Sequence, residues 1–293
     1  MKPIAEPTTP TATLSSTTLK RIVLGTDFSP LAERAATYAR GLALSFGASV
    51  DLVHVFDTDV YLDDAEPRLR TLEDRLQARS EKLEALAKRF VAAGAQTKME
   101  LPMERPGWSG LLKAAEADEA DLIVVATRSK AQLKRVFVGS TVEELIRHAS
   151  LPVLTVGPHV EAAPDGPMEF KRIVYATAFA PEEERAAQTA LLFAAHGGAN
   201  VYVCHVKDGH PDPNEAQAIL ERRIAASALG AFACELAVVH GAPAEAILEF
   251  AEKVRADLIV MGPRKHSFWL THVKRGVTLE VLAHAKCPVL TVH

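Results

Sequence analysis

The residues best suited to ligand chemistry gather in one stretch, Asp121 to Thr141. It begins with a short apolar run rich in β-branched residues and ends at Gly139-Ser140-Thr141, which opens the segment VEELIRHA. This pattern predicts a buried strand, a loop and then a helix. The unpaired amides and positive dipole at the start of that helix would suit a phosphate group. The loop adds basic side chains at Arg128, Lys130, Lys134 and Arg135.

The spacing within this stretch is more specific than its composition. A Walker loop needs GxxxxGK[ST] and a dinucleotide site needs GxGxxG after a strand, and the sequence contains neither. Instead, Ala126 is followed by two residues, Ser129, nine residues and Gly139-Ser140. This spacing resembles the nucleotide loop of the universal stress protein family, in which three glycines at these intervals precede serine or threonine. Ala126 and Ser129 replace the first two glycines, and small residues there suit close approach of a ligand better than a positive φ.

The segments before this loop predict the elements that position it. Arg21 to Gly25 has the pattern of a buried strand, followed by a turn at Thr26-Asp27. Ser29-Pro30 predicts the start of a helix that runs through Phe46 and ends at Gly47. A second strand, SVDLVHVF, follows.

A long charged segment, Glu66 to Phe90, predicts a helix with one apolar seam packed on a sheet. The seam residues are Leu69, Leu72, Leu76, Leu83, Leu86 and Phe90. After Gly94 we expect a strand at 97–101, a helix at 108–117, the strand, loop and helix of the opening stretch to His148, and a last strand PVLTV. Five strands alternating with helices predict a parallel sheet covered on both faces.

The second half repeats this order, which indicates a tandem duplication. The matched pairs are KRIVLGTDFSP at Lys20 with KRIVYATAFAP at Lys171, SVDLVHV at Ser49 with NVYVCHV at Asn200, ADLIVVAT at Ala120 with ADLIVMGP at Ala256, and RHASLPVLTVG at Arg147 with AHAKCPVLTVH at Ala283. We therefore expect a disordered tail at 1–18, domain 1 at 19–158, a linker at 159–168 and domain 2 at 169–293. The two PVLTV strands are expected to pair, which gives an intramolecular pseudo-dimer. Further homo-oligomer formation stays open.

Both halves resemble universal stress protein domains in their TDFS-like turn, LHV-like strand, loop and closing PVL strand. The resemblance implies an α/β fold with two tandem five-stranded parallel-sheet domains of strand order 3-2-1-4-5, Rossmann-like and adenine-nucleotide-binding. In that order the sheet reverses direction between its first and fourth strands, so the first turn and the strand-4 loop face one crevice.

The resemblance also implies which residues would contact ATP in domain 1. In ATP-binding relatives the acid of the first turn contacts the nucleoside, the backbone of strand 2 meets the base, and the strand-4 loop wraps the phosphates. The matching residues here are Gly25, Thr26, Asp27, Val55, Val125, Ala126, Arg128, Ser129, Gly139, Ser140 and Thr141. Asp27 has two alternatives: a hydrogen-bond acceptor for ribose or base, or the N-cap of the next helix.

The second half departs from the family pattern. Ala178 stands at the Asp27 position, so the nucleoside acceptor is absent from that turn. Gly262 keeps the first glycine, but Lys265 and Arg275 occupy the other two positions. The basic loop from Arg264 to Arg275 is interpreted as a solvated surface. We therefore expect ATP in domain 1 only.

Composition narrows the class of protein. The chain has 293 residues, a formal charge of −4 and 48% hydrophobic residues, which suits two globular domains, each with its own core, and disfavours a nucleic-acid surface. No apolar run approaches the roughly 18 residues that span a membrane. Cys204, Cys234 and Cys287 form no CxxC pair and suit reduced thiols in a cytoplasm.

Three functions are compatible with these observations. The first is a stress-response protein that binds or senses ATP in domain 1. The second is a nucleotide-free interaction scaffold with two vestigial crevices. The third is a slow ATPase or phosphotransferase. HExxH and GxSxG are absent and no residue presents itself as a general base, so no catalytic or metal-binding residue is predicted and a non-enzyme is expected.

Overall fold

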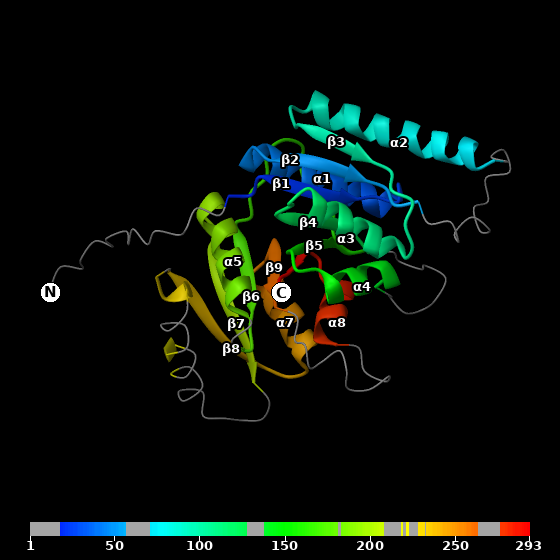
Figure 1. Cartoon of the computed structure of the whole chain (residues 1–293). Coiled ribbons are helices and arrows are strands. Elements are labelled where there is room, and N and C mark those ends of the chain that lie inside the picture. Colours follow the sequence, from blue (N-terminus) through cyan, green and yellow to red (C-terminus); the bar gives the residue numbers. More distant parts are fainter. Residues whose placement is uncertain are drawn as a thin grey trace.

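The fold is built on one continuous sheet of ten strands in the order β3-β2-β1-β4-β5-β10-β9-β6-β7-β8 (Figure 1). The computed structural model describes residues 18–56, 71–127, 138–180, 183–207, 218, 221, 222, 228–231, 233–262 and 276–293. Each half contributes five parallel strands in the order 3-2-1-4-5, with helices between them. The fold class expected from the sequence is confirmed.

The described elements follow the predicted order closely. In the first half they are β1 Arg21–Gly25, α1 Pro30–Phe46, β2 Ser49–Val53, α2 Leu72–Ala92, β3 Thr97–Glu100, α3 Gly107–Ala117, β4 Leu122–Ala126, α4 Ser140–His148 and β5 Val153–Val156. In the second half they are β6 Arg172–Ala176, α5 Glu184–Gly197, β7 Asn200–Lys207, η3 Ala228–Ala231, β8 Cys234–His240, α7 Pro243–Lys253, β9 Leu258–Met261, α8 Val277–His284 and β10 Val289–Thr291.

The closing strands join the two halves as the sequence predicts. β5 and β10 pair in antiparallel fashion, with Leu154 opposite Leu290 and Val153 opposite Thr291. All other strand pairs in the sheet are parallel. The predicted intramolecular pseudo-dimer is thus present as a shared sheet.

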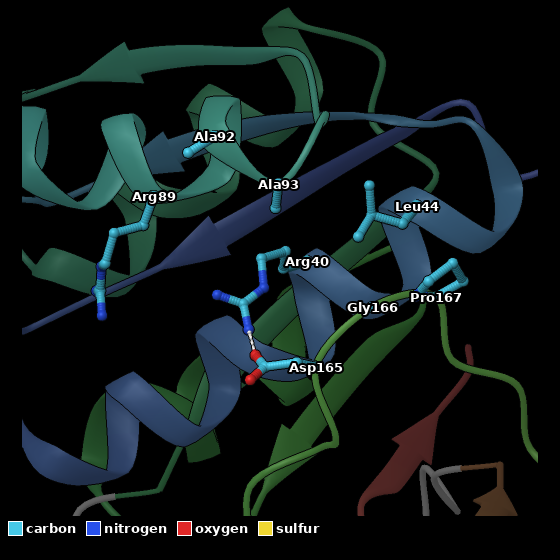
Figure 2. Close-up of a pocket in the computed structure, with 8 residues that line it drawn as sticks. All are labelled: Arg40, Leu44, Arg89, Ala92, Ala93, Asp165, Gly166 and Pro167. Carbon is cyan, nitrogen blue, oxygen red and sulfur yellow. Dashed lines mark hydrogen bonds and ion pairs between the residues drawn. The ribbon is translucent and has the colours of Figure 1, made fainter.

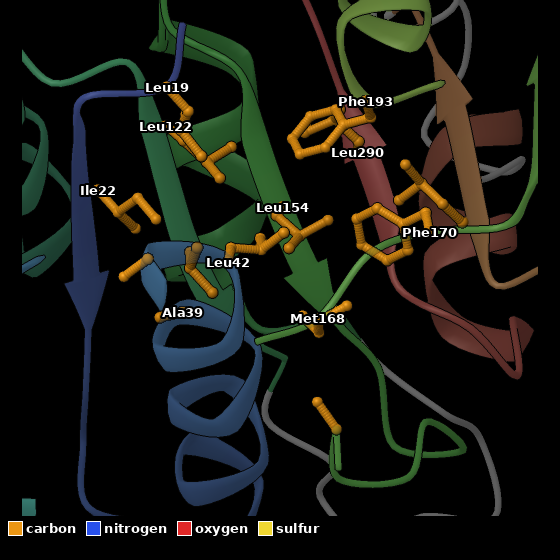
Figure 3. Close-up of a cluster of buried hydrophobic side chains, with 14 of the residues drawn as sticks. Leu19, Ile22, Ala39, Leu42, Leu122, Leu154, Met168, Phe170, Phe193 and Leu290 are labelled. Carbon is orange, nitrogen blue, oxygen red and sulfur yellow. The ribbon is translucent and has the colours of Figure 1, made fainter. Parts of the chain in front are cut away.

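Apolar side chains fill one core that continues from half to half. Leu154 and Leu290 lie in the same buried cluster as Leu42 of α1 and Phe193 of α5, and Figure 3 shows them together. A second cluster covers the opposite face and also contains residues from both halves. The expectation that each domain has its own core is therefore wrong, because the shared central strands carry the core across the junction.

The first helices show how local sequence sets element boundaries. α1 begins with Pro30 after the N-cap Ser29 and ends at Gly47, whose φ of 68° is left-handed, as predicted. In α2 only the later part of the predicted seam is buried: Leu83 and Phe90 are covered, whereas Leu72 is 41% exposed. Leu69 lies outside the described residues. The N-terminal part of α2 thus carries seam residues that the sheet does not cover.

The predicted linker, 159–168, is packed along α1. Arg34 Nη1 donates to the carbonyl oxygen of Val160 at 2.9 Å, and the Ala163 amide donates to Thr37 Oγ1 at 2.8 Å. Farther along the helix, Arg40 pairs with Asp165 (Figure 2). The segment therefore fixes the start of the second half against the first helix.

Candidate functional site

The carboxyl ends of β1 and β4 form the edge at which the predicted site residues converge. β1 pairs with β2 on one side and with β4 on the other, with Leu24 opposite both Leu52 and Val124. The turn that starts at Thr26 therefore lies beside the end of β4 at Ala126. This is a topological switch point, where open α/β sheets place their ligands.

Two equivalent aspartates connect the amino-terminal ends of neighbouring strands, at the side of the sheet away from the predicted site. Asp121 Oδ2 accepts from the backbone amides of Lys20 and Arg21 at 2.7 and 2.9 Å, which ties the start of β4 to the start of β1. In the second half Asp257 accepts from the amides at the start of β6, at 2.8 and 2.9 Å. Both halves thus set the two crevice-forming strands in the same register.

The first turn answers the question about Asp27. Ser29 is the N-cap of α1, and its Oγ accepts from the Ala32 amide at 3.2 Å. Asp27 Oδ1 accepts instead from the Ser29 amide at 3.0 Å, within the turn itself. The alternative in which Asp27 caps the helix is therefore wrong, and its half-buried carboxylate lies at the switch point.

His54 and Val55 follow β2 at the end of the sheet that carries the first turn. His54 Nδ1 donates to the Thr26 carbonyl oxygen at 2.8 Å, and its ring lies 4.6 Å from that of Phe28. Burial lowers the pKa of His54 despite this hydrogen bond. The amides of His54 and Phe56 both bond toward the β3 side. Since amides alternate along extended backbone, the Val55 amide points the other way, toward the first turn.

The small residues of the predicted site have different roles. A Cβ on Gly25 would lie 2.7 Å from Leu111 Cδ2, so this glycine makes room for α3. Ala126 ends β4 as an ordinary strand residue, which explains why glycine is not needed there. Val125 is buried in the core beside it.

The helix predicted to follow the loop begins where expected but without a side-chain cap. Gly139 is the N-cap of α4 with φ −63°, and no side chain of the described residues caps it. Ser140 and Thr141 are exposed in its first turn. The start of α4 therefore offers amides to a ligand. Arg128 and Ser129 lie outside the described residues.

The second half contains a group that the sequence interpretation missed. Glu183 Oε2 accepts from Thr177 Oγ1 at 2.6 Å, from the Ala178 amide at 2.9 Å and from the Ala180 amide at 3.3 Å. The side chain is almost fully buried, at 4% exposure. The turn that lacks an aspartate at Ala178 thus receives a carboxylate from farther along the chain. The basic loop, with Lys265 and Arg275, lies outside the described residues.

Burial affects all three cysteine thiols. Burial raises the pKa of Cys204 to about 12, of Cys234 to about 11 and of Cys287 to about 12, so the thiols stay protonated and unreactive. Among the described residues, no group of His, Cys, Asp and Glu is arranged to hold a metal ion. No helix in the described ranges is long and apolar enough to cross a membrane.

The cavity between α1, α2 and the linker is distant from this chemistry. It has a volume of about 640 Å³ and is lined by Arg40 and Arg89 among other residues (Figure 2). Both guanidinium groups already face carboxylates: Arg40 pairs with Asp165, and Arg89 pairs with Glu33 at 2.7 Å. This cavity therefore offers no free cationic group for an anion.

The duplicated 3-2-1-4-5 sheet, with a switch point in each half, defines a tandem α/β protein with a Rossmann-like fold. The chain belongs to the universal stress protein family, whose model matches residues 18–157 and 169–293. Universal stress protein Slr1230 of Synechocystis sp. is 25% identical and covers 93% of this chain and 99% of its own length.

Two further relatives agree with this assignment. Universal stress protein MJ0531 of Methanocaldococcus jannaschii is 32% identical over 47% of this chain and 81% of its own length. The crystal structure of a universal stress protein from Archaeoglobus fulgidus matches with a TM-score of 0.70 and 21% identity, covering 93% of this chain and 97% of that one. This last likeness shows the fold alone.

Proposed function

We propose that this protein is a stress-response protein that binds ATP, or a related adenine nucleotide, in domain 1 and does not turn it over. Domain 1 comprises residues 19–158, and the packed segment 159–168 joins it to domain 2 at 169–293. The unpaired thiols, buried at Cys204 and Cys287 and half-buried at Cys234, suit a cytoplasmic location. Domain 2 takes no nucleotide in this proposal.

One observation carries the proposal. The Asp27 carboxylate lies at the β1–β4 switch point without serving as the cap of α1. It can accept from ribose or base there, while the exposed first turn of α4 and Ala126 would face the phosphates. Arg128 and Ser129 complete the proposed contacts from the loop, and Val55 supplies backbone to the base.

Binding without turnover is proposed because the sequence presents no general base beside the proposed phosphate contacts. His54, which donates through Nδ1 and can accept only through Nε2, packs against Phe28 beside the first turn. A general base must reach the attacking water directly or through one further water. In the proposed binding mode His54 lies on the side of the nucleoside contacts, whereas the phosphates face the first turn of α4.

The test is calorimetric titration of the full chain with ATP at physiological salt. We expect one ATP per chain and no release of phosphate over the same period. Nucleotide released on denaturing the purified protein should be adenine nucleotide. Two sites per chain, or none, would contradict the proposal. Separate domain fragments are unsuitable, because each would expose half of the shared core.

A nucleotide-free scaffold is the second candidate, and two observations favour it. A Cβ on Gly25 would lie 2.7 Å from a methyl group of Leu111, so packing alone gives a reason for glycine there. Phe28 and Phe179 both adopt a φ of 59°, so the unusual turn is kept in the half that lacks the aspartate. An absence of ATP binding with an intact fold would support this candidate.

A further inference from the structure

Glu183 lies where domain 1 has an alanine. A residue that packs against Glu183 also differs between the two domains. The repeat places Ala32 opposite Glu183 and Ala126 opposite Gly262. A Cβ on Gly262 would lie 2.8 Å from Glu183 Cγ. The glycine kept at the first loop position therefore makes room for the glutamate side chain, whereas domain 1 has neither the glutamate nor the glycine.

The backbone of Glu183 is anchored as well as its side chain. Its carbonyl oxygen accepts from Tyr175 Oη at 3.1 Å, and burial raises the pKa of this tyrosine, which keeps it a donor. Domain 1 has Leu24 at the Tyr175 position. The hydroxyl of Thr177 donates to the carboxylate and accepts from the Phe179 amide at 2.8 Å. The end of β6, the turn that follows it and the start of α5 thus all contact Glu183.

This arrangement is that of an anion site with its ligand in place. Two backbone amides and one hydroxyl converge on one carboxylate oxygen, in a position that solvent barely reaches. Convergent amides in a turn bind carboxylates and phosphates. The negative charge also lies at the N-terminal end of α5, where the helix dipole favours it.

We propose that Glu183 is a tethered carboxylate ligand that occupies the domain-2 crevice, so that the crevice accepts a small free carboxylate only when Glu183 is removed. An anionic nucleotide is excluded because the buried carboxylate takes the turn's donors and repels a phosphate. The proposal explains why domain 2 has Glu183 together with Gly262, which makes room for its side chain, and Tyr175, which bonds to its backbone. It does not depend on nucleotide binding in domain 1.

Chemical rescue of Glu183→Ala tests it. This variant leaves the donors at Thr177, Ala178 and Ala180 without their partner, and we expect its Tm to fall by roughly 3–10 °C. Sodium formate should then raise the Tm of the variant progressively, relative to sodium chloride at equal ionic strength, because a ligand of the folded state stabilises it. The wild type should show no such difference between formate and chloride.

Two variants serve as controls. Glu184→Ala removes the exposed neighbouring carboxylate, and Glu183→Gln keeps the crevice filled; formate should rescue neither. If Glu183→Ala does not fold in buffer, the readout becomes recovery of native circular dichroism on refolding in formate. An equal response to formate and chloride in Glu183→Ala, or an equal formate response in Glu183→Gln, would overturn the proposal.

Discussion

The switch points of the two halves share their framework and differ in the residue that supplies a carboxylate to the turn. In each half a histidine donates through Nδ1 to the carbonyl oxygen of the turn threonine at 2.8 Å: His54 to Thr26, and His205 to Thr177. Domain 1 then supplies a carboxylate from within the turn, at Asp27, whereas domain 2 supplies one from the helix start, at Glu183. A duplicated fold can therefore keep its turn geometry while the carboxylate that bonds to the turn comes from a different position in the chain.

The strongest way to break this comparison is to give domain 1 the residues of domain 2. Ala32→Glu with Ala126→Gly introduces the glutamate together with the room that it needs. We expect ATP affinity to fall by about 4 kcal/mol, the cost of like charges about 4 Å apart near a protein surface. Calorimetric titration measures the loss, and Ala126→Gly alone is the control. Unchanged ATP affinity in the double variant would show that a glutamate at this position does not block nucleotide binding in domain 1.

Substitutions in the shared core should affect stability equally in the two halves, unlike substitutions in the proposed ligand sites. Leu154 and Leu290 are fully buried and face each other across β5 and β10. Leu154→Ala and Leu290→Ala should each lower the free energy of unfolding by about 2–5 kcal/mol. Denaturant unfolding of the full chain measures both. If only one variant loses stability, or if a second transition appears, the halves do not unfold as one unit.

Asp27→Ala should weaken ATP binding by about 1.5–3 kcal/mol, the usual value of a hydrogen bond to a charged group. Asp27→Asn keeps an oxygen for the Ser29 amide, so it separates the charge from the turn hydrogen bond. Glu33→Ala, which removes a nearby carboxylate of α1, should leave affinity unchanged. Equal affinity in all three variants, measured by titration calorimetry, would limit Asp27 to shaping the turn.

The smallest effect concerns pH. Burial holds the pKa of His54 below its ordinary value of 6.5. The His54 ring is therefore protonated more readily in the unfolded chain than in the folded chain. The stability from neutral His54 is complete above pH 6.5 and is lost as pH falls through the lower folded value. His54→Gln should therefore flatten the decline of stability below pH 6.5, and NMR titration should locate the ring's pKa directly. An ordinary or raised pKa would contradict this.

Local sequence signals predicted the elements well, and tertiary contacts explain what they missed. Pro30 and Gly47 mark the ends of α1 because their backbone requirements are local. Ser29 and Asp27 are equally good caps by residue type, and only the turn geometry distinguishes them. Glu183 has acidic neighbours on both sides in the sequence, so no pattern singles it out; the comparison with Ala32 was the available signal.

Burial patterns have a similar limit. An apolar run such as VLTV indicates that β5 is buried on both faces, but not which segments cover it. The duplicated closing strands predicted the pairing of β5 with β10. They did not predict that residues as far apart as Leu42 and Phe193 would share one cluster, because that depends on how α1 and α5 lie over the joined sheet.

Because β5 and β10 pair in antiparallel fashion, the predicted sites of the two halves lie at opposite ends of the strands. Strands of the first half all run one way and those of the second half run the opposite way, so their carboxyl ends emerge at opposite edges of the sheet. A ligand entering domain 1 and a molecule approaching the equivalent edge of domain 2 would therefore arrive from opposite directions. With one edge proposed to open to a nucleotide and the other filled by Glu183, the chain has an inherent polarity that a symmetric dimer of identical domains cannot have.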